Sequence, residues 1–402
     1  MFYNNFMDAA DLLEKFKPYM AVEIDEDSPI IPYACTESSP IASAANSSAE
    51  PVLATDHLHI QRVSAGRSQK VPLLKTVLTS VCSRNCHYCA FHSQRDFERH
   101  SLTPDQLARA FMGAYQAGIV RGLFLSSGIP GRGSKIQDDL LAAAELLRRK
   151  YHYSGYLHLK LMPGAEYDQV AAAVRLANRV SINLEAPTER SLASLATGKS
   201  LKRELLMPLQ WVHEMRIKQD PNAPAGDVFP SSTTQFVAGG YERDDELLDL
   251  SQTLYRLHHL KRIYYSRFKP VTGTPMENHP SASPLHIFRL YQASFLLRDY
   301  GYDPKDFEYE DGYLPQNQDP KLSWAEKHYR HQPLEITKAD YQHLIRVPGI
   351  GPRSARWILD HRSELSPQRT AQLKHAGVQL KHAEPFIELK GRRLSTQLPL
   401  WT

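Results

Sequence analysis

From about residue 71 the chain alternates between short apolar stretches and helical stretches, and this pattern limits its possible folds more than any other feature. Strands are expected at Leu73–Ser80, Gly122–Ser127, Gly155–Leu161, Arg179–Glu185, Thr233–Ala238 and Arg262–Phe268. Helices are expected between them, at Thr103–Ala117, Gln137–Lys150, Ala165–Ala177, Lys202–Lys218 and Asp244–His258. Six such units predict an α/β fold with a parallel sheet covered by helices. A partial barrel and a flavodoxin-like open sheet both fit this alternation.

A cysteine array follows the first predicted strand directly. Cys82, Cys86 and Cys89 are spaced C-x3-C-x2-C, and three thiolates on one loop are suited to hold an iron–sulfur cluster. Three cysteines leave one iron of a four-iron cluster without a protein ligand, and an open metal position is typical of chemistry. Zinc is the alternative, with His87 or His92 as fourth ligand. The position at a strand end favours the cluster and the partial barrel, because barrel cofactor sites lie there.

This spacing, with Tyr88 just before the third cysteine, resembles the signature of the radical S-adenosylmethionine (SAM) superfamily. The resemblance implies a partial (β/α)6 TIM-like barrel, a 4Fe–4S cluster on Cys82, Cys86 and Cys89, and SAM bound at the free iron. It also implies one-electron cleavage of SAM to methionine and a 5′-deoxyadenosyl radical, with the electron supplied by a donor such as flavodoxin or ferredoxin.

Three strand ends carry further candidate residues for binding SAM. The second strand ends in Ser126, Ser127 and Gly128, where the superfamily has a small turn that contacts the SAM amino group. Lys160, near the end of the third strand, would need an anionic partner if buried, which SAM or a substrate could supply. Glu185 ends the fourth strand and could bind the SAM ribose or amino group, or else cap the next helix.

The other strands offer candidates for both SAM and substrate. The stretch around Gln235 and Gly239 resembles the superfamily's G-x-I-x-G-x-x-E pattern, with Gln235 in place of its first glycine, and implies contact with adenine. His158, which shares a strand face with Lys160, is a substrate candidate. Tyr265 and Arg267 on the sixth strand could meet a substrate phosphate, or serve packing and surface charge instead.

The end of the chain carries the second strong motif and most of its positive charge. Residues 321–402 hold 14 of the 48 Lys and Arg residues but only 7 of the 44 Asp and Glu residues, which points to a polyanionic partner. A helix expected at Thr337–Arg346 is followed by Val-Pro-Gly-Ile-Gly-Pro-Arg-Ser-Ala, which resembles the helix–hairpin–helix motif of DNA repair glycosylases. Candidate contacts to nucleic acid are Val347, Gly349, Gly351, Arg353, Ser354 and Arg356. A hairpin used only for packing is the alternative.

The two motifs together resemble the family of DNA modification/repair radical SAM proteins, from about Pro72 to about Ile387. The expected organisation is an N-terminal extension of uncertain structure at 1–70, a radical SAM barrel at 71–300, a connector at 301–330, a helix–hairpin–helix module at 331–390 and a tail at 391–402. Cys35, in the extension, is more typical of an incidental thiol than of a catalytic one.

Composition indicates the cellular compartment that we expect for the chain. The chain has 402 residues, 42% hydrophobic and 23% charged, with four cysteines and no apolar run long enough to span a membrane. No secretory signal is visible, and the low cysteine count excludes a disulfide scaffold, so a reducing cytoplasm is expected.

The leading hypothesis is therefore a radical SAM enzyme that modifies or repairs nucleic acid, with DNA favoured, docked by the C-terminal module. A base within a duplex would have to be flipped out to reach the barrel mouth. One alternative is a radical SAM enzyme acting on a small molecule, with a structural C-terminal module. Another is a non-catalytic nucleic-acid-binding protein with an iron–sulfur sensor.

Overall fold

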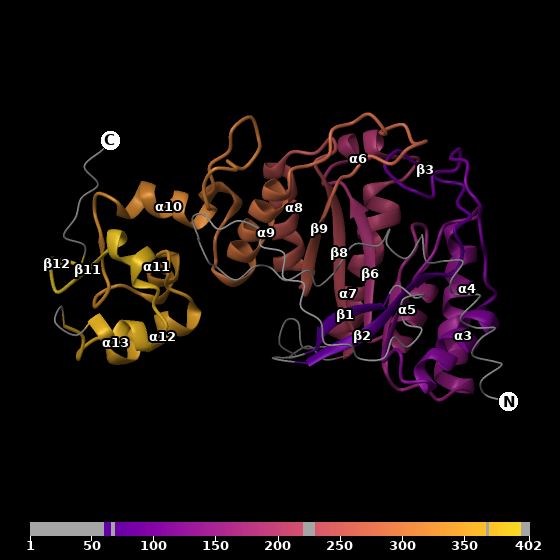
Figure 1. The fold of residues 1–402 in the computed structure, drawn as a ribbon, viewed down its shortest axis with the longest axis horizontal. Helices are drawn as coiled ribbons and strands as arrows, with labels where there is room; N and C mark the ends of the chain where they lie inside the picture. The colour runs from indigo at the N-terminus through magenta and orange to yellow at the C-terminus, as the bar shows by residue number, and fades with distance from the viewer. Residues whose placement is uncertain (1–59, 66–68, 220–229, 367–369, 395–402) are drawn as a thin grey trace, which may run out of the picture. The chain divides into compact units, whose positions relative to one another are not determined.

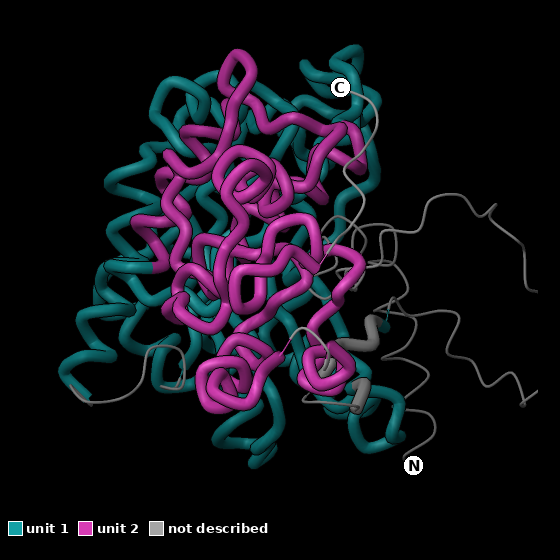
Figure 2. The backbone as a smooth tube through the Cα atoms, turned by 90° about the vertical axis from the view of Figure 1, so that its left-hand side faces the viewer, with its two compact units in different colours: residues 1–242, 256–282 teal, residues 243–255, 283–402 magenta. Residues whose placement is uncertain are grey.

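The structure is a computed structural model that describes residues 60–394 apart from 66–68, 220–229 and 367–369. The chain divides into two compact units (Figure 2). The first comprises the chain up to Glu242 together with Arg256–Ala282, and the second comprises Arg243–Tyr255 and Ser283–Thr402. These boundaries differ from the expected domain limits, because Arg243–Tyr255 is grouped with the end of the chain. The N-terminal extension and Cys35 lie outside the described residues.

The first unit contains a seven-stranded sheet in which all six expected strands are present (Figure 1). Its parallel strands are β2 (Gln69–Val77), β4 (Gly122–Ser126), β5 (Tyr156–Lys160), β6 (Arg179–Glu185), β8 (Ser231–Ala238) and β9 (Arg262–Arg267). A further strand, β1 (Ile60–Ala65), pairs with β2 in the antiparallel direction.

The order of the strands decides between the two folds that the sequence allowed. Neighbours in the sheet follow one another in chain order, β1-β2-β4-β5-β6-β8-β9. A doubly wound, flavodoxin-like sheet needs a point where the strand order reverses, and this sheet has none. Strictly sequential parallel order is the order of a barrel, and the sheet is a curled half-barrel of six parallel strands.

Alternating side chains divide between the two faces of this sheet. Apolar side chains that are fully buried form one face, among them Leu123, Leu125, Leu157, Leu159, Val180, Ile182 and Leu184. Polar and aromatic side chains meet on the other. There the ammonium groups of Lys75 and Lys160 each lie 5.6 Å from the centre of the Phe124 ring. The His158 ring meets it edge to face, with the ring centres 4.6 Å apart. The polar face therefore belongs to the inside of the half-barrel.

The helices between the strands pack on one another in chain order. They are α3 (Pro104–Gln116), α4 (Gly133–Glu145), α5 (Tyr167–Leu176) and α7 (Met207–Gln219). As expected, α3 begins with Thr103 as N-cap and Pro104 as first residue, and the Thr103 hydroxyl accepts from the Gln106 N–H. Beyond the carboxyl end of the sheet lie the short helix α6 (Glu189–Leu195) and a two-residue ribbon of β3 (Asn85–Cys86) and β7 (Ala196–Thr197).

The second unit is mainly helical. It contains most of α8 (Asp244–Leu257), and also α9 (Pro284–Asp299), α10 (Pro320–Tyr329), α11 (Tyr341–Arg346), α12 (Pro352–His361), α13 (Thr370–His375), α14 (Leu380–Ala383) and the short strands β10 (Leu334–Glu335), β11 (Ile387–Leu389) and β12 (Arg392–Arg393). The expected helix at Thr337–Arg346 starts later, because Asp340 is its N-cap and accepts from the His343 N–H. Thr337 instead donates to Glu335. None of the described helices is long and apolar enough to cross a membrane.

Candidate active site

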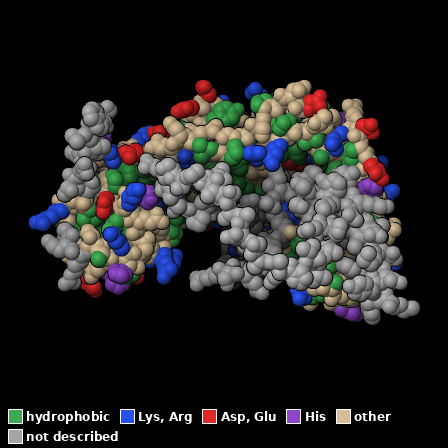
Figure 3. All heavy atoms as spheres, viewed as in Figure 1, with side chains coloured by type: hydrophobic (Ala, Val, Ile, Leu, Met, Phe, Trp, Pro, Cys, Tyr) green, Lys and Arg blue, Asp and Glu red, His purple; other side chains and the backbone are tan. Residues whose placement is uncertain are grey.

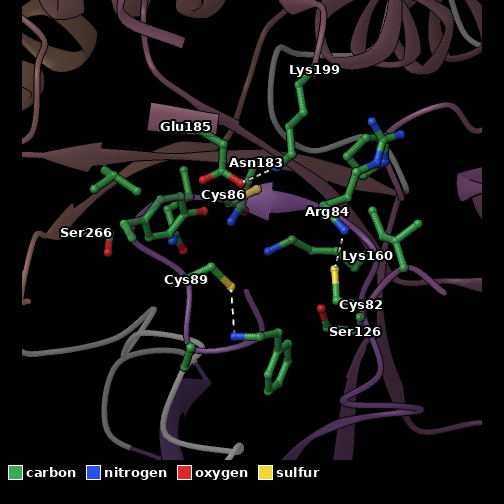
Figure 4. Close-up of a pocket in the computed structure, with 18 of the residues that line it drawn as sticks. Cys82, Arg84, Cys86, Cys89, Ser126, Lys160, Asn183, Glu185, Lys199 and Ser266 are labelled. Atoms are coloured by element: carbon green, nitrogen blue, oxygen red, sulfur yellow. Dashed lines mark hydrogen bonds and ion pairs between the residues drawn. The ribbon is translucent and has the colours of Figure 1, made fainter. Parts of the chain in front are cut away.

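A cavity of about 800 Å³ lies at the carboxyl ends of the parallel strands (Figure 4). All three cysteines of the array line it, and so does Tyr88. The array is the loop that leaves β2, so the strand brings the thiols to the end of the sheet where the other strands also finish. A volume of this size suits cofactors and a small molecule together.

The cysteine loop is fastened to the segment around β7. Cys86 pairs with Ala196 in the β3–β7 ribbon, and the His87 N–H donates to the Leu195 carbonyl at 2.9 Å. The Arg84 guanidinium donates to the Gly198 carbonyl at 3.0 Å. The loop therefore has a fixed backbone position next to the residues that follow β7.

Arg99 also stabilises the cysteine loop, through hydrogen bonds to main-chain carbonyls. The Arg99 guanidinium donates to five main-chain carbonyls, those of Ser80, Phe91, His92, Ser93 and Arg95, at 2.8–3.3 Å. Each bond from a charged donor is stronger than a neutral one. Arg99 thus ties together the turn that carries Cys89 without any contact to a thiol.

Two of the thiols receive main-chain N–H groups, as sulfur ligands of clusters do. The Arg84 N–H points to Cys82 Sγ and the Phe91 N–H to Cys89 Sγ, each at 3.4 Å. Burial raises the pKa of Cys86 and of Cys89 above the usual thiol range. Positive charge or bound metal is what favours the thiolate form in such surroundings.

The Glu185 carboxylate and the Lys199 ammonium form a buried ion pair in this cavity (Figure 4). Glu185 Oε1 lies 3.0 Å from Lys199 Nζ, and the two side chains are only 5% and 6% exposed. Burial alone would lower the pKa of Lys199, but the negative charges of Cys86 and Glu185 outweigh it and raise that pKa. Lys199 is therefore a stable positive charge beside a cysteine of the array.

Glu185 is held in an unusual backbone conformation. Its φ is +66°, in the left-handed region that a side chain with a Cβ seldom occupies, and the β6–β8 register shifts between Asn183 and Glu185. Such strain persists where the surroundings require it and is common at functional sites. Its second oxygen, Oε2, is buried with no hydrogen-bond partner among the described residues. The irregular end of β6 thus leaves an oxygen of the Glu185 carboxylate available in the cavity as a hydrogen-bond acceptor.

The turn after β4 lines the opposite part of the cavity, as expected for Ser126, Ser127 and Gly128. Gly128 approaches the cysteine loop closely, because an added Cβ would overlap the Val81 carbonyl oxygen. The Gly128 N–H donates to the Thr79 carbonyl at 2.7 Å. The Ser127 hydroxyl is buried without a partner among the described residues, so it is available to a ligand.

Lys160 and Gln235 also line the cavity, and Lys160 extends toward the space among the three cysteines (Figure 4). Gly239 does not line it. Its φ of +89° and its close approach to Ala282 explain the glycine instead. Both N–H groups of the Gly239-Gly240 turn donate to the Glu242 carboxylate. The spacing Gly239-x-x-Glu242 therefore reflects a capped turn directly after β8.

Two substrate candidates, His158 and Tyr265, do not line the cavity. His158 is fully buried, and its Nε2 lies 2.8 Å from the Ser181 hydroxyl, below the cavity rather than in its lining. Tyr265 is 1% exposed and stacks on Phe236. It lies on the outer face of the sheet, because strand alternation places Ser266 on the inner one. Arg267 does line the cavity.

The hairpin residues of the second unit divide into buried and exposed ones. The side chains of Val347 and Ser354 are buried, and the Ser354 hydroxyl donates to the Ala376 carbonyl at 2.9 Å, so neither side chain is free to contact nucleic acid. Gly349 has a φ of +79°, and an added Cβ would overlap the Gln379 carbonyl oxygen. Gly351 is half-buried, and Arg353 and Arg356 are exposed.

Sequence reasoning missed several residues of the site. Lys199, Asn183, Ser266 and Arg84 all line the cavity, and Arg84 forms an ion pair with Glu204 at 2.9 Å. Lys199 lies in a Thr-Gly-Lys-Ser turn far from the cysteines in sequence, with no spacing that links it to them. Arg84 and Asn183 carried a usable signal, because Arg84 lies between Cys82 and Cys86 and Asn183 is two residues before Glu185 on the same strand.

The zinc alternative finds little support among the histidines. His92 is buried, and its Nδ1 accepts the Gln94 N–H at 3.2 Å within its own turn. Within the described ranges no three Cys, His, Asp or Glu side chains are grouped as ligands of a single metal ion.

Comparison with known proteins agrees with this geometry. Residues 76–252 match the family model of the Radical SAM superfamily. This stretch is a radical SAM domain. The match covers less than half of the chain, and the cofactors of that superfamily are a 4Fe–4S cluster and SAM. Enzymes of this kind commonly take electrons from a reductant.

The chain is also similar to individual proteins at low identity. It is 23% identical over 246 residues to 7,8-didemethyl-8-hydroxy-5-deazariboflavin synthase from Methanococcus maripaludis, a match that covers 57% of this chain and 66% of the relative. Among solved structures, methylornithine synthase (PylB) matches with a TM-score of 0.44 and 14% identity over 56% of this chain and 61% of that one. HydG, a maturase of [FeFe]-hydrogenase, matches with a TM-score of 0.44 and 12% identity over 56% and 49%.

The residues present fit both cofactors. Three thiols without disulfide partners open on one cavity, and the thiols of Cys82 and Cys89 receive main-chain N–H groups. The same cavity offers two buried oxygen atoms without partners among the described residues, on Ser127 and Glu185, which suit the ammonium and hydroxyl groups of a polar ligand.

Proposed function

We propose that this chain is a radical SAM enzyme that acts on a small molecule bound in the half-barrel cavity. The observation that carries the proposal is the placement of the three cysteines and Glu185 around one cavity of about 800 Å³. A relative that the chain resembles is named as a synthase of a small molecule, which supports the same substrate class. The earlier preference for nucleic acid is thereby replaced as the leading hypothesis.

In this proposal the residues divide into two groups around the cofactors. Cys82, Cys86 and Cys89 would hold the cluster, and the Ser126–Gly128 turn, Lys160, Glu185 and Gln235 would hold SAM, with Tyr88 beside the cluster. The bound pair supplies a 5′-deoxyadenosyl radical for hydrogen abstraction, with one electron from a small carrier such as flavodoxin or ferredoxin. We place the enzyme in the cytoplasm, where such carriers are reduced.

The remaining site residues position ligands and exclude water. The Glu185–Lys199 pair fixes a carboxylate oxygen at the end of β6, so that it can accept from a ligand hydroxyl or ammonium without rearrangement. Tyr88 is half-buried, and desolvation and nearby Glu185 raise its pKa well above its usual value, so its hydroxyl stays neutral. The strands close the bottom of the cavity, where buried His158 is bonded to Ser181.

The test is an anaerobic assay of the reconstituted, dithionite-reduced chain for 5′-deoxyadenosine release from SAM. Reactions contain either a low-molecular-weight cell extract fraction, duplex DNA, or single-stranded DNA or RNA. We expect the small-molecule fraction to stimulate release. Stimulation by a nucleic acid alone would overturn the substrate class, and no release from a chain with a full cluster would overturn the radical function.

A nucleic-acid substrate is the second candidate, and one observation favours it. Helices α11 and α12 flank a hairpin that exposes Arg353 and Arg356 at the start of α12. Lys and Arg side chains also gather on the face of the second unit that Figure 3 shows. Phosphate contacts of this kind position a protein on DNA without reading sequence.

Duplex binding, measured by fluorescence anisotropy across a salt series, tests this second candidate. We expect Arg353→Gln/Arg356→Gln to weaken binding and to reduce the slope of log K against log salt by roughly 2, since each phosphate contact contributes about 0.9. Arg362→Gln/Arg392→Gln is the matched control, because it removes the same charge from exposed positions away from the hairpin. Equal slopes in both variants would exclude the hairpin as the contact.

A further inference from the structure

The cavity carries more positive than negative side chains. Its lining includes five cationic residues and a single carboxylate, that of Glu185. The cationic residues are Arg84, Lys160, Lys199, Arg267 and Lys269. Two of them have carboxylate partners, since Arg84 pairs with Glu204 at 2.9 Å and Lys199 pairs with Glu185 at 3.0 Å. Arg267 and Lys269 have no such carboxylate partner among the described residues.

Lys269, Arg267 and Lys160 differ in how far their side chains are exposed to solvent. Lys269 is exposed, Arg267 is half-buried and Lys160 is 6% exposed. Within the part of the chain that the structure describes, no carboxylate forms an ion pair with Arg267 or Lys269. A lining with one sign of charge and low-dielectric walls attracts ligands of the opposite sign.

The segment that carries Arg267 and Lys269 is fixed beside the cysteine loop. Strand β9 ends at Arg267, and the chain then returns to the loop, where Arg95 Nε donates to the Thr272 carbonyl at 2.9 Å. The Met276 N–H donates to the His87 carbonyl at 3.3 Å. The two cations consequently stay at the cavity that also contains the thiols.

The cofactors of the proposed function do not supply the missing negative charge. SAM carries one carboxylate against a sulfonium and an ammonium group, so it adds net positive charge. Of the three thiols, those of Cys86 and Cys89 already face Lys199. In the proposed function Lys160 binds SAM, so Arg267 and Lys269 are left for another ligand.

We infer that the substrate is a small organic oxyanion whose phosphate or carboxylate groups bind Arg267 and Lys269 at the mouth of the cavity. The inference rests on the proposed function for the chemistry that follows, but not for the binding itself. A guanidinium binds either group through two parallel hydrogen bonds, and an ammonium adds a compact charge. Lys160 is more deeply buried and stays with SAM, as in the proposed function.

Isothermal titration calorimetry of the full chain tests the inference with two probes, inorganic pyrophosphate and citrate. We expect at least one to bind, and Arg267→Gln/Lys269→Gln to weaken it at least about 100-fold, because it removes both charged donors of the site. The control Arg175→Gln/Lys218→Gln removes the same charge from exposed helix surfaces and should bind as the wild type does. The stronger probe identifies phosphate or carboxylate as the preferred group.

Each titration is run on the chain with and without its cluster, alongside a titration with SAM. If neither probe binds, or if Arg267→Gln/Lys269→Gln binds as well as the control, the inference is wrong while SAM binding can still support the proposed function. If the cluster and SAM do not bind but anion binding still depends on Arg267 and Lys269, the inference holds and the radical function fails. Circular dichroism of each variant confirms that it is folded.

Discussion

Each of the two units buries a lysine, and the two lysines have opposite surroundings. Lys199 in the first unit faces Cys86 and Glu185, and these negative charges raise its pKa despite burial. Lys321 in the second unit is 4% exposed, donates to the Ile350 carbonyl at 2.7 Å and lies over the Tyr300 ring. Burial lowers the pKa of Lys321 to about 7, against a smaller opposing effect of Asp319.

The difference distinguishes a buried charge that belongs to a ligand site from one that supports a loop. A buried charge with a matched counter-charge in an open cavity is placed for ligands, and the cavity of the first unit has the features of a site. A buried ammonium held mainly by a carbonyl and a ring supports a loop, here the hairpin that contains Ile350. The two regions can therefore be separated by experiments that act on one lysine or on its neighbours.

The largest effect is expected from the thiols. Replacing Cys82, Cys86 or Cys89 with alanine should reduce 5′-deoxyadenosine release to the no-enzyme background, because two thiolates do not hold the cluster in place. Iron and sulfide content and the release assay measure this, and the second unit should unfold at an unchanged urea concentration. Full turnover by any of the three variants would contradict the assignment of the site.

The ion pair of the first unit offers the next test. Lys199→Met should cost about 3–5 kcal/mol in the free energy of unfolding, because it leaves the Glu185 carboxylate buried without its partner. Urea unfolding followed by Trp211, on α7, reports on this unit. The double variant Glu185→Gln/Lys199→Met removes both charges and should recover most of the loss. A single variant as stable as the wild type would show that the pair is not stabilising.

Lys321 predicts a pH dependence of the second unit. Its pKa is about 7 when folded and about 10.4 when unfolded, so the unfolded state binds more protons between these values. Stability should therefore rise by a few kcal/mol from pH 7 to pH 10, and the charge penalty should be complete below pH 7. The measurement is urea unfolding followed by Trp324 and Trp357 in a Trp211→Phe background.

Lys321→Met should remove this rise in stability, whatever its effect at a single pH. The methionine also leaves the Ile350 carbonyl without its donor, which costs about 1–3 kcal/mol at every pH, so only the slope is diagnostic. A variant that keeps the full slope of the wild type would assign the pH dependence to other groups.

The smallest effect on stability is expected from the glycines of the hairpin. Gly349→Ala should destabilise the second unit by about 1–2 kcal/mol or more, because φ is +79° there and the new Cβ meets the Gln379 carbonyl. Gly351→Ala is the control, since its nearest neighbour would be the Tyr300 hydroxyl at an ordinary 3.7 Å. Thermal unfolding compares the two. Equal stability would show that packing does not require glycine at position 349.

The sequence predicted the features that depend on local pattern. All six parallel strands followed from apolar runs, and the cysteine loop followed from the spacing of Cys82, Cys86 and Cys89. Glu185 was found because it ends a strand, although the irregular register that turns it into the cavity left no mark in the sequence. Patterns of this kind report secondary structure and strand ends directly.

The features that the sequence did not predict depend on contacts between distant segments. Lys199 meets Cys86 only because β3 pairs with β7, more than a hundred residues away along the chain. The burial of Tyr265 was left open by the sequence, because it depends on the stacking of its ring on Phe236 of β8. The hydrogen bond of the Ser354 hydroxyl could not be predicted either, because its partner is the Ala376 carbonyl of a later segment.

If the chain acts as proposed, the five carbonyls held by Arg99 have a consequence for its exposure to oxygen. A loop whose shape depends on protein hydrogen bonds keeps its thiols in place when iron is lost. Repair then needs only iron, sulfide and reductant, with no refolding of the barrel. Loss of the cluster in air is then reversible, and the chain without its cluster stays folded until iron is available.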